Sequence, residues 1–484
     1  MSALAALSIA SEIYPLIKTG GLADVAGALP GALAREGIAT RTLTPGYPAI
    51  LAKLETAAPA RAYPVLFGGP ARVLAASAAG LDLFVLDAPH LYERPGNPYL
   101  GPDGLDWPDN AQRFAALARV GADIAKGAIP GFVPDVVHAH DWQGALAPAY
   151  LHYDGGARPG AILTIHNLAF QGHFPAALLG ELGLPAHALS IHGVEYFEGV
   201  GFLKAGLQFA DRITTVSPTY AREIMTPQFG MALDGLLRAR AGDVEGIVNG
   251  IDDTVWNPAT DPHLAQNYSA LRIDMRPRNK TALQQRFALT ASAETPLFGV
   301  VSRLTSQKGL DLLIAALPEL LDRGAQLAVL GAGERALEQR FAAAAFAYKG
   351  AVGCAFAYDE ALSRLMQAGS DFIVVPSRFE PCGLTQLYAL RYGATPLVAR
   401  VGGLADTIID ANEAALGAGV ATGIQFSPPD AAALAYALER ALALFSDVAT
   451  MRRMRLNGMR ADVSWRGPAK RYAAIYRALA RVAR

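Results

Sequence analysis

The sequence predicts an α/β protein with two doubly wound domains, each built on a parallel β-sheet. Two observations support this class. Short apolar runs alternate along the chain with Gly-rich or polar turns and longer helical patterns, an order typical of βα units. The chain has 484 residues, of which 52% are hydrophobic, and this is enough for more than one core of ordinary size.

Each predicted strand is a short apolar run that ends in a turn, where the side chains of a functional site gather in a parallel sheet. The first run is a strand rather than a secretion signal, because it has no basic segment before it and no cleavage pattern after it. The predicted strands are residues 4–10, 133–138, 161–165, 212–216, 297–302, 326–330, 371–376 and 395–399.

A domain boundary is predicted within residues 247–262, where a strand-like segment is followed by Pro258 and Pro262. We expect an N-terminal domain at 1–250, a C-terminal domain at 251–460 and a C-terminal helix at 461–484. The pentapeptide Gly-Gly-Leu-Ala-Asp stands at 20–24 and again at 402–406, each time between a predicted strand and a predicted helix. This repetition suggests two similar halves.

The C-terminal helix has an apolar face and is otherwise basic. A basic helix can lie on a membrane surface. We favour docking of its apolar face on the protein, because the chain as a whole is nearly neutral. The apolar face is formed by Tyr472, Ile475, Tyr476, Leu479 and Val482, and the basic residues are Arg471, Arg477, Arg481 and Arg484.

The composition excludes several classes of partner. Lys and Arg number 42 against 43 Asp and Glu, a formal net charge of −1, so no broad positive field attracts nucleic acid or an anionic membrane. The longest uncharged stretches carry Gly, Pro and polar residues throughout and do not resemble spanning helices. Cys354 and Cys382 provide neither a disulfide framework nor a zinc-ligand spacing. We therefore expect a reducing, cytoplasmic location.

The first candidate site follows the first predicted strand, at Lys18, Gly20 and Gly21. Two glycines let a ligand approach the backbone, and the N–H groups at the start of the next helix suit an anion such as phosphate. The loop is not a Walker A motif, because the lysine precedes the glycines. A purely structural turn is the alternative. The helix should bury Leu22, Val25, Ala26, Leu29 and Leu33.

A second candidate site follows the predicted strand 297–302. Arg303 and Lys308 lie across a turn at the carboxyl end of this strand, where open α/β sheets bind ligands. An arginine fork and a lysine point charge suit a diphosphate. A pair of ordinary surface cations is the alternative.

A third segment, Gly331-Ala332-Gly333-Glu334-Arg335-Ala336, fits the G-x-G-x-x-A pattern of dinucleotide-binding proteins. The acidic residue that should bind the ribose about 20 residues later is missing around 348–354. We favour a turn requirement near a nucleotide over a nicotinamide cofactor site.

A fourth candidate site follows the predicted strand 371–376. Glu380 precedes Pro381, and the amides of Cys382, Gly383 and Leu384 lie at the start of a helix, where they can bind sugar hydroxyls or an anion. Glu380 can alternatively be an ordinary acidic residue near a helix start. Cys382 has no histidine nearby in sequence, so a buried structural cysteine is favoured over a nucleophile.

Histidines form a fifth pattern, because all except His263 precede residue 200. His138 and His140 stand before Asp141, and His166 starts a polar segment that ends at 172. Both groups are expected to follow strands and to line a cleft. A metal site is the alternative, but it lacks carboxylates at a matching spacing.

These segments together resemble the bacterial glycogen synthase and plant starch synthase family of retaining glycosyltransferases. The resemblance spans nearly the whole chain, and its motifs occur in the right order. They lie at residues 11–15 with the Lys18 loop, 94–99, 138–142, 166–172, 248–252, 303–309, 380–386 and 402–406.

The resemblance implies a GT-B architecture, in which two Rossmann-like domains face each other across a deep cleft and the C-terminal helix returns to the first domain. The N-terminal domain would then form the glucan acceptor side, and the C-terminal domain would bind the nucleotide sugar. The implied donor is ADP-glucose, the implied acceptor is the non-reducing end of an α-1,4-glucan such as glycogen, and the α configuration is retained. Neither a cofactor nor a metal is expected.

The same resemblance assigns roles to individual residues. Glu380, His166, Arg303 and Lys308 are the implied catalytic residues, the two cations neutralising the diphosphate and His166 lying against the transferred sugar. The remaining implied residues bind substrate: Lys18, Gly20, Gly21, Asp24, Asp141, Asn249, Cys382, Gly383, Leu384 and Thr385. One departure concerns the wider retaining GT-B pattern E-x7-E, whose second acid is replaced by Tyr388, so that Glu380 is the one acid at this turn.

Two other functions are weighed against this one. An oxidoreductase linked to a nicotinamide cofactor rests on residues 331–336 alone and leaves Lys18, Arg303 and Lys308 unexplained. A two-domain sugar-binding protein fits the chain length, but it predicts a secretion signal and no cations for a diphosphate.

Overall fold

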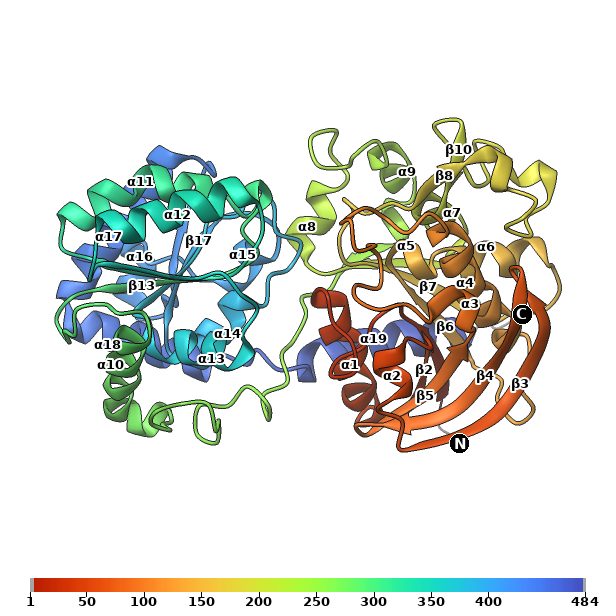
Figure 1. Ribbon diagram of the computed structural model, residues 1–484, viewed down its shortest axis with the longest axis horizontal. Helices are drawn as coiled ribbons and strands as arrows, with labels where there is room; N and C mark the ends of the chain where they lie inside the picture. Colours follow the sequence, from red (N-terminus) through yellow and green to blue (C-terminus); the bar gives the residue numbers. More distant parts are fainter. Residues whose placement is uncertain (1–3, 482–484) are drawn as a thin grey trace. The chain divides into compact units, whose positions relative to one another are not determined.

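The computed structural model describes residues 4–481 and divides into two compact units (Figure 1). Unit 1 comprises Met1–Gly250 and Trp465–Arg484, and unit 2 comprises Ile251–Ser464. The second division falls a few residues after the predicted boundary at 460, because the segment at 463–464 pairs with Ile251: the amide of Ile251 donates to the carbonyl of Val463 at 2.8 Å. Val482 and Arg484 of the expected helix lie outside the described residues.

Unit 1 contains a nine-stranded sheet in the order β12-β11-β7-β6-β1-β2-β5-β4-β3. The strands from β12 to β5 are parallel, and β4 and β3 extend the sheet as an antiparallel hairpin. The strands are β1 (Leu4–Ile9), β2 (Ile38–Pro45), β3 (Thr56–Leu66), β4 (Gly69–Ala78), β5 (Leu81–Asp87), β6 (Val136–His140), β7 (Gly160–Ile165), β11 (Arg212–Thr215) and β12 (Val244–Gly246).

Helices and a small sheet complete unit 1. The helices are α1 (Gly21–Ala34), α2 (Pro48–Leu51), α3 (Pro89–Tyr92), α4 (Asn110–Ala125), α5 (Asp141–Gly144), α6 (Leu146–Tyr153), α7 (Phe202–Phe209), α8 (Pro218–Glu223) and α9 (Asp234–Ala239), with 3-10 turns at Ala176–Leu178, Ala186–Ala188 and Ala241–Asp243. The small sheet has the order β8-β10-β9, with β8 (His173–Pro175), β9 (Glu195–Tyr196) and β10 (Gly199–Gly201). Helix α1 buries the apolar residues that the sequence predicts.

Unit 2 contains six parallel strands in the order β15-β14-β13-β16-β17-β18. Counted along the chain, this is the Rossmann order 3-2-1-4-5-6, with its switch point between β13 and β16. The strands are β13 (Leu297–Val301), β14 (Gln326–Leu330), β15 (Val352–Ala355), β16 (Phe372–Val375), β17 (Thr395–Ala399) and β18 (Ile424–Phe426). The parallel part of unit 1 has the corresponding switch point between β1 and β6.

The helices of unit 2 cover both faces of its sheet (Figure 1). Helices α11, α12 and α17 lie on one side, and α10, α13, α14 and α18 lie on the other. The helices are α10 (Pro277–Arg286), α11 (Leu310–Asp322), α12 (Arg335–Ala347), α13 (Glu360–Gly369), α14 (Thr385–Arg391), α15 (Gly402–Thr407), α16 (Glu413–Ala418), α17 (Ala431–Ser446) and α18 (Val448–Arg460), with 3-10 turns at Ala270–Met275 and Ser306–Lys308.

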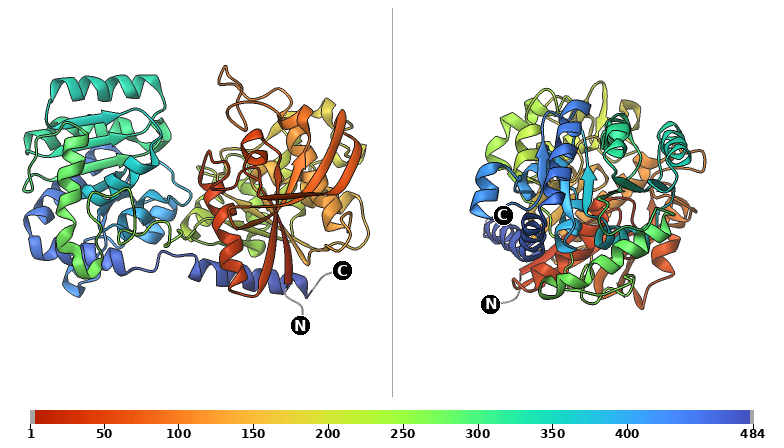
Figure 2. Two further views of the ribbon diagram at one scale, coloured as in Figure 1. Left: turned by 60° about the horizontal axis from the view of Figure 1, so that its bottom comes forward. Right: turned by 90° about the vertical axis from the view of Figure 1, so that its left-hand side faces the viewer.

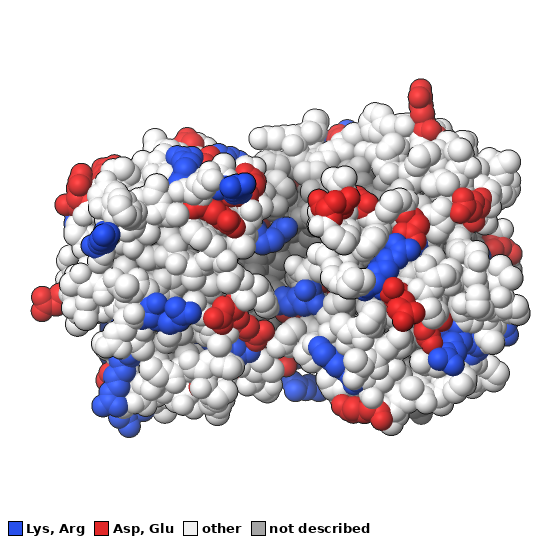
Figure 3. All heavy atoms as spheres, viewed as in Figure 1, with Lys and Arg blue, Asp and Glu red and all other residues white. Residues whose placement is uncertain are grey.

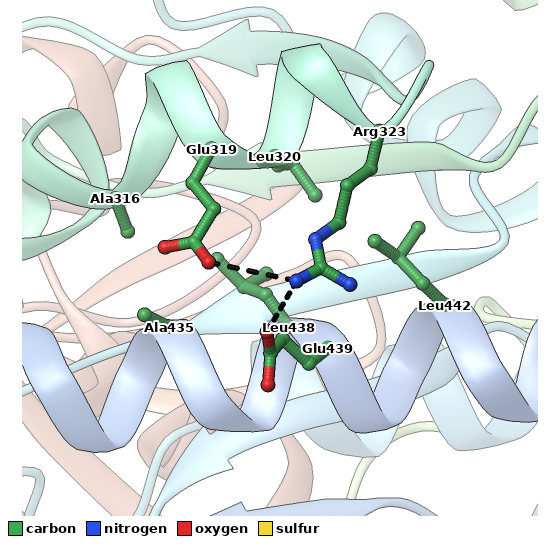
Figure 4. Close-up of a pocket in the computed structure, with 8 residues that line it drawn as sticks. All are labelled: Ala316, Glu319, Leu320, Arg323, Ala435, Leu438, Glu439 and Leu442. Atoms are coloured by element: carbon green, nitrogen blue, oxygen red, sulfur yellow. Dashed lines mark hydrogen bonds and ion pairs between the residues drawn. The ribbon is translucent and has the colours of Figure 1, made fainter.

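Two of these helices enclose a shallow hollow at the surface of unit 2. The hollow between α11 and α17 is closed by Arg323, which forms ion pairs with Glu319 and Glu439 (Figure 4). Leucines from both helices meet beneath these charges. This arrangement joins two helices of one face and leaves little room for a ligand.

The C-terminal helix α19 (Arg466–Ala480) belongs to unit 1 and runs beside α1 (Figure 2). Tyr472, Ile475 and Tyr476 are buried, and they pack with residues of α1, β1 and β6. The Tyr476 hydroxyl shares a hydrogen bond of 2.6 Å with Nδ1 of His138, at the centre of the sheet. Docking of the apolar face on the protein is thereby confirmed for the described part of the helix.

The predicted strands are present, and one of them is shifted. The segment predicted at 133–138 is β6 at Val136–His140, because Pro134 keeps Val133 out of the sheet and leaves it 67% exposed. Within residues 4–481, no helix is long and apolar enough to cross a membrane. Charges of both signs are interspersed on the visible face of each unit (Figure 3).

Candidate active site

A buried carboxylate organises the loop after β1 in unit 1. Glu12 accepts hydrogen bonds from the amide of Thr19, from the Thr19 hydroxyl at 2.6 Å and from the amide of Gly20 at 3.2 Å. The Tyr99 hydroxyl donates to the same carboxylate at 2.7 Å. Glu12 and Tyr99 belong to motifs of the sequence, but the sequence alone gives neither of them a role. The structure shows that they fix the backbone of the Lys18 loop.

The loop places two predicted site residues together. Lys18 Nζ lies 2.7 Å from Oδ1 of Asp24, in the first turn of α1, and 5.5 Å from the ring centre of Tyr14. Gly20 and Gly21 face open space, since a Cβ built on either would have no atom within 4 Å. The fold of unit 1 therefore does not itself require glycine here.

The histidines occupy different positions from those expected. His138 and His140 lie inside β6, where both are buried, instead of following the strand. His138 shares hydrogen bonds with Thr164 of β7, at 2.5 Å, and with Tyr476. His140 Nδ1 lies 3.0 Å from Nε2 of His166, which directly follows β7. Of these three histidines, His166 is thus the one that follows a strand.

Burial keeps these imidazoles neutral. Burial lowers the pKa of His140 to about 3. The pKa of His166 also falls well below its ordinary value, through burial and the neighbouring His140. The pKa of His138 falls through burial and the two other rings. A neutral imidazole can donate or accept a hydrogen bond, but at neutral pH it does not supply a positive charge.

Asp141 positions the segment that contains His166. Its Oδ1 accepts hydrogen bonds from the amides of His166, at 2.6 Å, and Asn167, at 3.4 Å. Asp141 has a left-handed backbone with φ of 48°, a conformation that aspartate and asparagine tolerate better than most residues. Burial raises the pKa of this carboxyl to about 7, although the two amides oppose the change.

Asn249 follows β12 and is buried, but it contacts none of the other predicted site residues through a hydrogen bond. Its Oδ1 has no hydrogen-bond partner within the described part of the chain. A buried acceptor without a partner is costly in a folded protein. Asn249 is therefore suited to a ligand that donates a hydrogen bond.

In unit 2, the structure brings together Lys308 and Glu380, 72 residues apart in sequence. Nζ of Lys308 lies 2.6 Å from Oε2 of Glu380, which also accepts from the Ser377 hydroxyl at 2.9 Å. Glu380 is 6% exposed, and its Oε1 has no hydrogen-bond partner among the described residues. Lys308 and Glu380 follow β13 and β16, so the pair sits at the switch point of this sheet.

Arg303 also follows β13, but its guanidinium is exposed and has no hydrogen-bond or ion-pair partner within residues 4–481. The amides of Gly383, Leu384 and Thr385 have no acceptor within the described range either, since they lie at or just before the first turn of α14. Cys382 is buried. Unit 2 thus presents an arginine and a set of N–H donors, all suited to an anion.

The repeated pentapeptide has different surroundings in the two units. At Gly402 a Cβ would lie 1.9 Å from the carbonyl oxygen of Glu380, and at Gly403 it would lie 2.3 Å from that of Cys382. The amide of Gly403 donates to the carbonyl of Glu380 at 3.1 Å. These glycines support the Glu380 loop through backbone packing, whereas Gly20 and Gly21 face open space.

The G-x-G-x-x-A segment also has a structural role. A Cβ at Gly331 would lie 1.7 Å from the carbonyl oxygen of Ser302, and one at Gly333 would lie 2.2 Å from that of Leu304. The amide of Glu334 donates to Leu304 at 2.7 Å. Both glycines are needed to support the loop that carries Arg303. They leave no space between the two backbones for a dinucleotide. This agrees with the interpretation that the turn requires these glycines and that the segment is not a nicotinamide cofactor site.

Two further residues explain features of the sequence. Tyr388, at the position of the second acid in E-x7-E, is buried and stacks on Trp256 with ring centres 3.6 Å apart. An acid at this position would lose the stacking on Trp256.

Phe356 and Tyr358 follow β15 and are 38% and 79% exposed. The sequence analysis gave them no role, because no strand was predicted before them. Within residues 4–481, no group of three His, Cys, Asp or Glu residues has the geometry of a metal site.

Comparison with known proteins gives matches along nearly the whole chain. The family model described as the starch synthase catalytic domain matches residues 6–239, and the model described as glycosyl transferases group 1 matches residues 282–458. A glycogen synthase from Rhodopseudomonas palustris (strain BisB18) is 61% identical over 479 residues, which cover 99% of this chain and 98% of the relative. One from Methylocella silvestris is 61% identical over 482 residues, covering 99% and 100%.

Solved structures agree with these matches. The catalytic domain of starch synthase IV from Arabidopsis thaliana, bound to ADP and acarbose, is 30% identical, with a TM-score of 0.88 and coverage of 99% of this chain and 100% of that one. A sucrose-phosphate synthase from Thermosynechococcus elongatus shares the fold with a TM-score of 0.61 at 18% identity, covering 99% and 100%. The predicted GT-B class is confirmed.

The glycine pairs lead to a prediction about stability. Gly403→Ala should lower the free energy of unfolding by about 1 to 3 kcal/mol, because its Cβ would overlap the carbonyl of Cys382. Gly20→Ala should not lower it, since the site is open and its backbone is extended. Urea denaturation of both variants measures the difference. Equal losses in the two variants would contradict the assignment.

Asp141 leads to a prediction about pH. The pKa of about 7 in the folded protein lies above the unfolded value, so the protonated carboxyl favours folding at low pH, and this contribution is lost as the pH rises from about 4 to about 7. Asp141→Asn removes the titration and keeps the left-handed backbone. The stability of the parent relative to this variant should fall by up to about 4 kcal/mol across that range.

Urea denaturation of the parent protein and of Asp141→Asn from pH 4 to pH 8 tests this prediction. The three buried histidines titrate in both proteins, and their contribution largely cancels in the difference. A difference in stability that stays constant with pH would show that Asp141 is ionised throughout.

Proposed function

Since the chain belongs to the glycogen and starch synthase family of glycosyltransferases, we propose that it transfers glucose from ADP-glucose to the non-reducing end of an α-1,4-glucan such as glycogen. The α configuration of the glucose is retained. The observation that carries the proposal is the cluster of diphosphate-binding groups in unit 2, where Lys308 pairs with Glu380 beside unoccupied backbone donors.

The leaving diphosphate is bound by the cations of the loop after β13. Arg303 has no hydrogen-bond or ion-pair partner among the described residues and can form two parallel hydrogen bonds to phosphate oxygens. Lys308 supplies a second positive charge next to Glu380. The amides of Gly383, Leu384 and Thr385 donate to the remaining oxygens. These groups stabilise the charge that develops on ADP as the glycosidic bond breaks, so the reaction needs no metal.

The exposed rings after β15 suit the base of the nucleotide. Phe356 and Tyr358 stand at the carboxyl edge of the same parallel sheet, two strands away from β13. Aromatic side chains stack on nucleobases and do not distinguish them strongly. The preference for adenine rests on family membership, since the related starch synthase IV was solved with ADP.

Glu380 binds and orients the glucose. Its Oε2 is held by Lys308 and Ser377, and its Oε1 is available for a sugar hydroxyl. Both oxygens lie on a loop that is supported from behind by Gly402 and Gly403. The carboxylate also stabilises positive charge on the sugar ring as the bond to ADP breaks.

Unit 1 supplies the groups that complete the reaction. Lys18 and the amide of Gly21 bind phosphate, and Asp24 holds the Lys18 side chain. The amide of Gly20 donates to Glu12 and so fixes the loop instead of binding the ligand. Neutral His166, positioned by Asp141, forms hydrogen bonds with the transferred glucose, and Asn249 accepts one from a substrate hydroxyl. The 4-hydroxyl of the glucan attacks the face of the sugar that ADP leaves and passes its proton to the departing phosphate oxygen, and the configuration is retained.

A cytoplasmic location fits this activity. Cys354 and Cys382, both in unit 2, form no disulfide, and Cys382 is buried behind the Glu380 loop. An enzyme of the cytoplasm needs no disulfide.

The proposed function predicts release of ADP that depends on both substrates. Purified protein with ADP-glucose and glycogen should release ADP rapidly, and EDTA should not slow the reaction. UDP-glucose with glycogen is run in parallel, as is ADP-glucose without glycogen. Turnover with UDP-glucose but not with ADP-glucose would contradict the proposed donor. No turnover with either donor would favour the alternative of a sugar-binding protein without catalytic activity.

A second prediction concerns Lys308. Lys308→Ala should weaken ADP binding by about 1.5 to 3 kcal/mol, the range for a hydrogen bond to a charged group. Calorimetric titration with ADP measures this without the acceptor. Lys349→Ala, which removes an exposed lysine of the same unit, is the matched control and should bind ADP as the parent does. Parental affinity of Lys308→Ala would remove this lysine from the donor site.

A further inference from the structure

An exposed aromatic surface in unit 1 has no part in the chemistry described so far. Phe170, Phe197 and Met231 are 52%, 68% and 37% exposed, and Tyr196, which contacts Phe197 and the Met231 backbone, is partly exposed. We call these four residues the aromatic ledge. They come from three segments that are separated in sequence but gathered at the end of the unit where β8, β10 and α9 lie (Figure 1).

Hydrogen bonds hold the three segments together. The Tyr196 hydroxyl and Nε2 of Gln171 both donate to the carbonyl oxygen of Met231, each at 3.0 Å. Nε2 of His173 lies 2.8 Å from the carbonyl oxygen of Tyr196. The rings of Tyr196 and Phe197 are in edge contact, with centres 4.7 Å apart. The ledge is therefore organised before any ligand binds, which reduces the entropy cost of binding.

The backbone of the ledge is strained at the residues that carry its apolar side chains. Phe197 and Glu198 have φ of 44° and 61°, and Met231 and Ala232 have φ of 48° and 65°. Glycine adopts such angles at no steric cost, but a bulky residue does not. Strain of this kind is typical of functional segments. Because Phe197 and Met231 are exposed, core packing does not explain why side chains stand at these positions.

The ledge is continuous with the part of unit 1 that binds the transferred sugar. Phe170 lies on the same loop as His166, and the amides of Phe202 and Leu203 fix that loop by donating to Gly172 and Gln171. A Cβ at Gly172 would lie 2.4 Å from the Trp142 ring, so the loop also packs against the residue that follows Asp141. A chain whose end lies at His166 can therefore extend over Phe170.

The chemistry of the ledge suits a sugar polymer. The pyranose ring has apolar C–H faces and hydroxyl groups around its edge, and it matches aromatic faces bordered by polar groups. Gln171, His173 and Glu198 provide that polar border. Lys and Arg are absent from residues 166–203 in the described chain, which disfavours a polyanion.

We propose that the aromatic ledge binds the glucan acceptor at sugar residues beyond the reacting end, so that it confers preference for long chains. This inference rests on the proposed transferase function for its acceptor, but glucan binding can be measured without catalysis.

The test compares Phe197→Ala and Phe170→Ala with the parent protein by calorimetric titration with maltoheptaose in the absence of donor. Each substitution should weaken binding about tenfold, as expected for the loss of one stacked ring. The KM for maltoheptaose should rise by a similar factor, whereas the affinity for ADP stays that of the parent. Phe197→Trp should restore binding, and Phe346→Ala, which removes an exposed ring of unit 2, should change nothing.

Unchanged maltoheptaose affinity in both variants would overturn the proposal. If the variants lost self-association in sedimentation while keeping their glucan affinity, the ledge would instead be a contact between copies of this chain. Weaker glucan binding in a protein without transferase activity would support the ledge and refute the proposed function, so the two failures are distinguishable.

Discussion

The ion pair between Lys308 and Glu380 joins the two loops on which the charged site of unit 2 depends. Glu380 is buried, and an ionised carboxylate is stable there only with a partner and further hydrogen bonds. Each loop is held on its other side by glycines: Gly333 packs against the first, and Gly402 packs against the second. Backbone packing thus sets the distance at which the two charges meet.

In unit 1, a buried carboxylate rather than packing glycines holds the loop at the switch point. This switch point lies between β1 and β6, and the loop after β1 is held by the buried carboxylate of Glu12 through the backbone and the hydroxyl of Thr19. Gly20 and Gly21 of this loop therefore pack against no other segment of unit 1. The same pentapeptide supports a loop in unit 2 and faces open space in unit 1, so its repetition reports a shared strand-to-helix turn rather than a shared function.

Local signals in the sequence were sufficient for the central strands of both sheets and for most loops of the site, but strands such as β2, β5, β15 and β18 were not predicted. Apolar runs located the central strands, and the turns after them contained Lys18, Lys308 and Glu380. The places of His138 and His140 could not be predicted, because the hydrogen bonds that allow imidazoles inside β6 come from Ser8, Thr164 and Tyr476, far away in sequence. The role of Glu12 was hidden for the same reason, since its partner Tyr99 lies on a distant loop. Glycines required for packing, such as Gly331, look like ligand-binding glycines in the sequence. The two kinds are distinguished only in the structure, where a packing glycine faces another backbone segment.

The arrangement of charges limits the chemistry that the site can perform. His166 and His140 are held neutral by burial, so neither supplies the proton or the positive charge that a leaving group needs at neutral pH. The cations at the switch point of unit 2 are Arg303 and Lys308, and they suit a diphosphate rather than a hydroxyl. A diphosphate needs no proton to leave when its charge is neutralised in this way. The neutral histidines of unit 1, together with the fixed cations Arg303 and Lys308 of unit 2, therefore favour transfer from an activated donor over hydrolysis by acid and base.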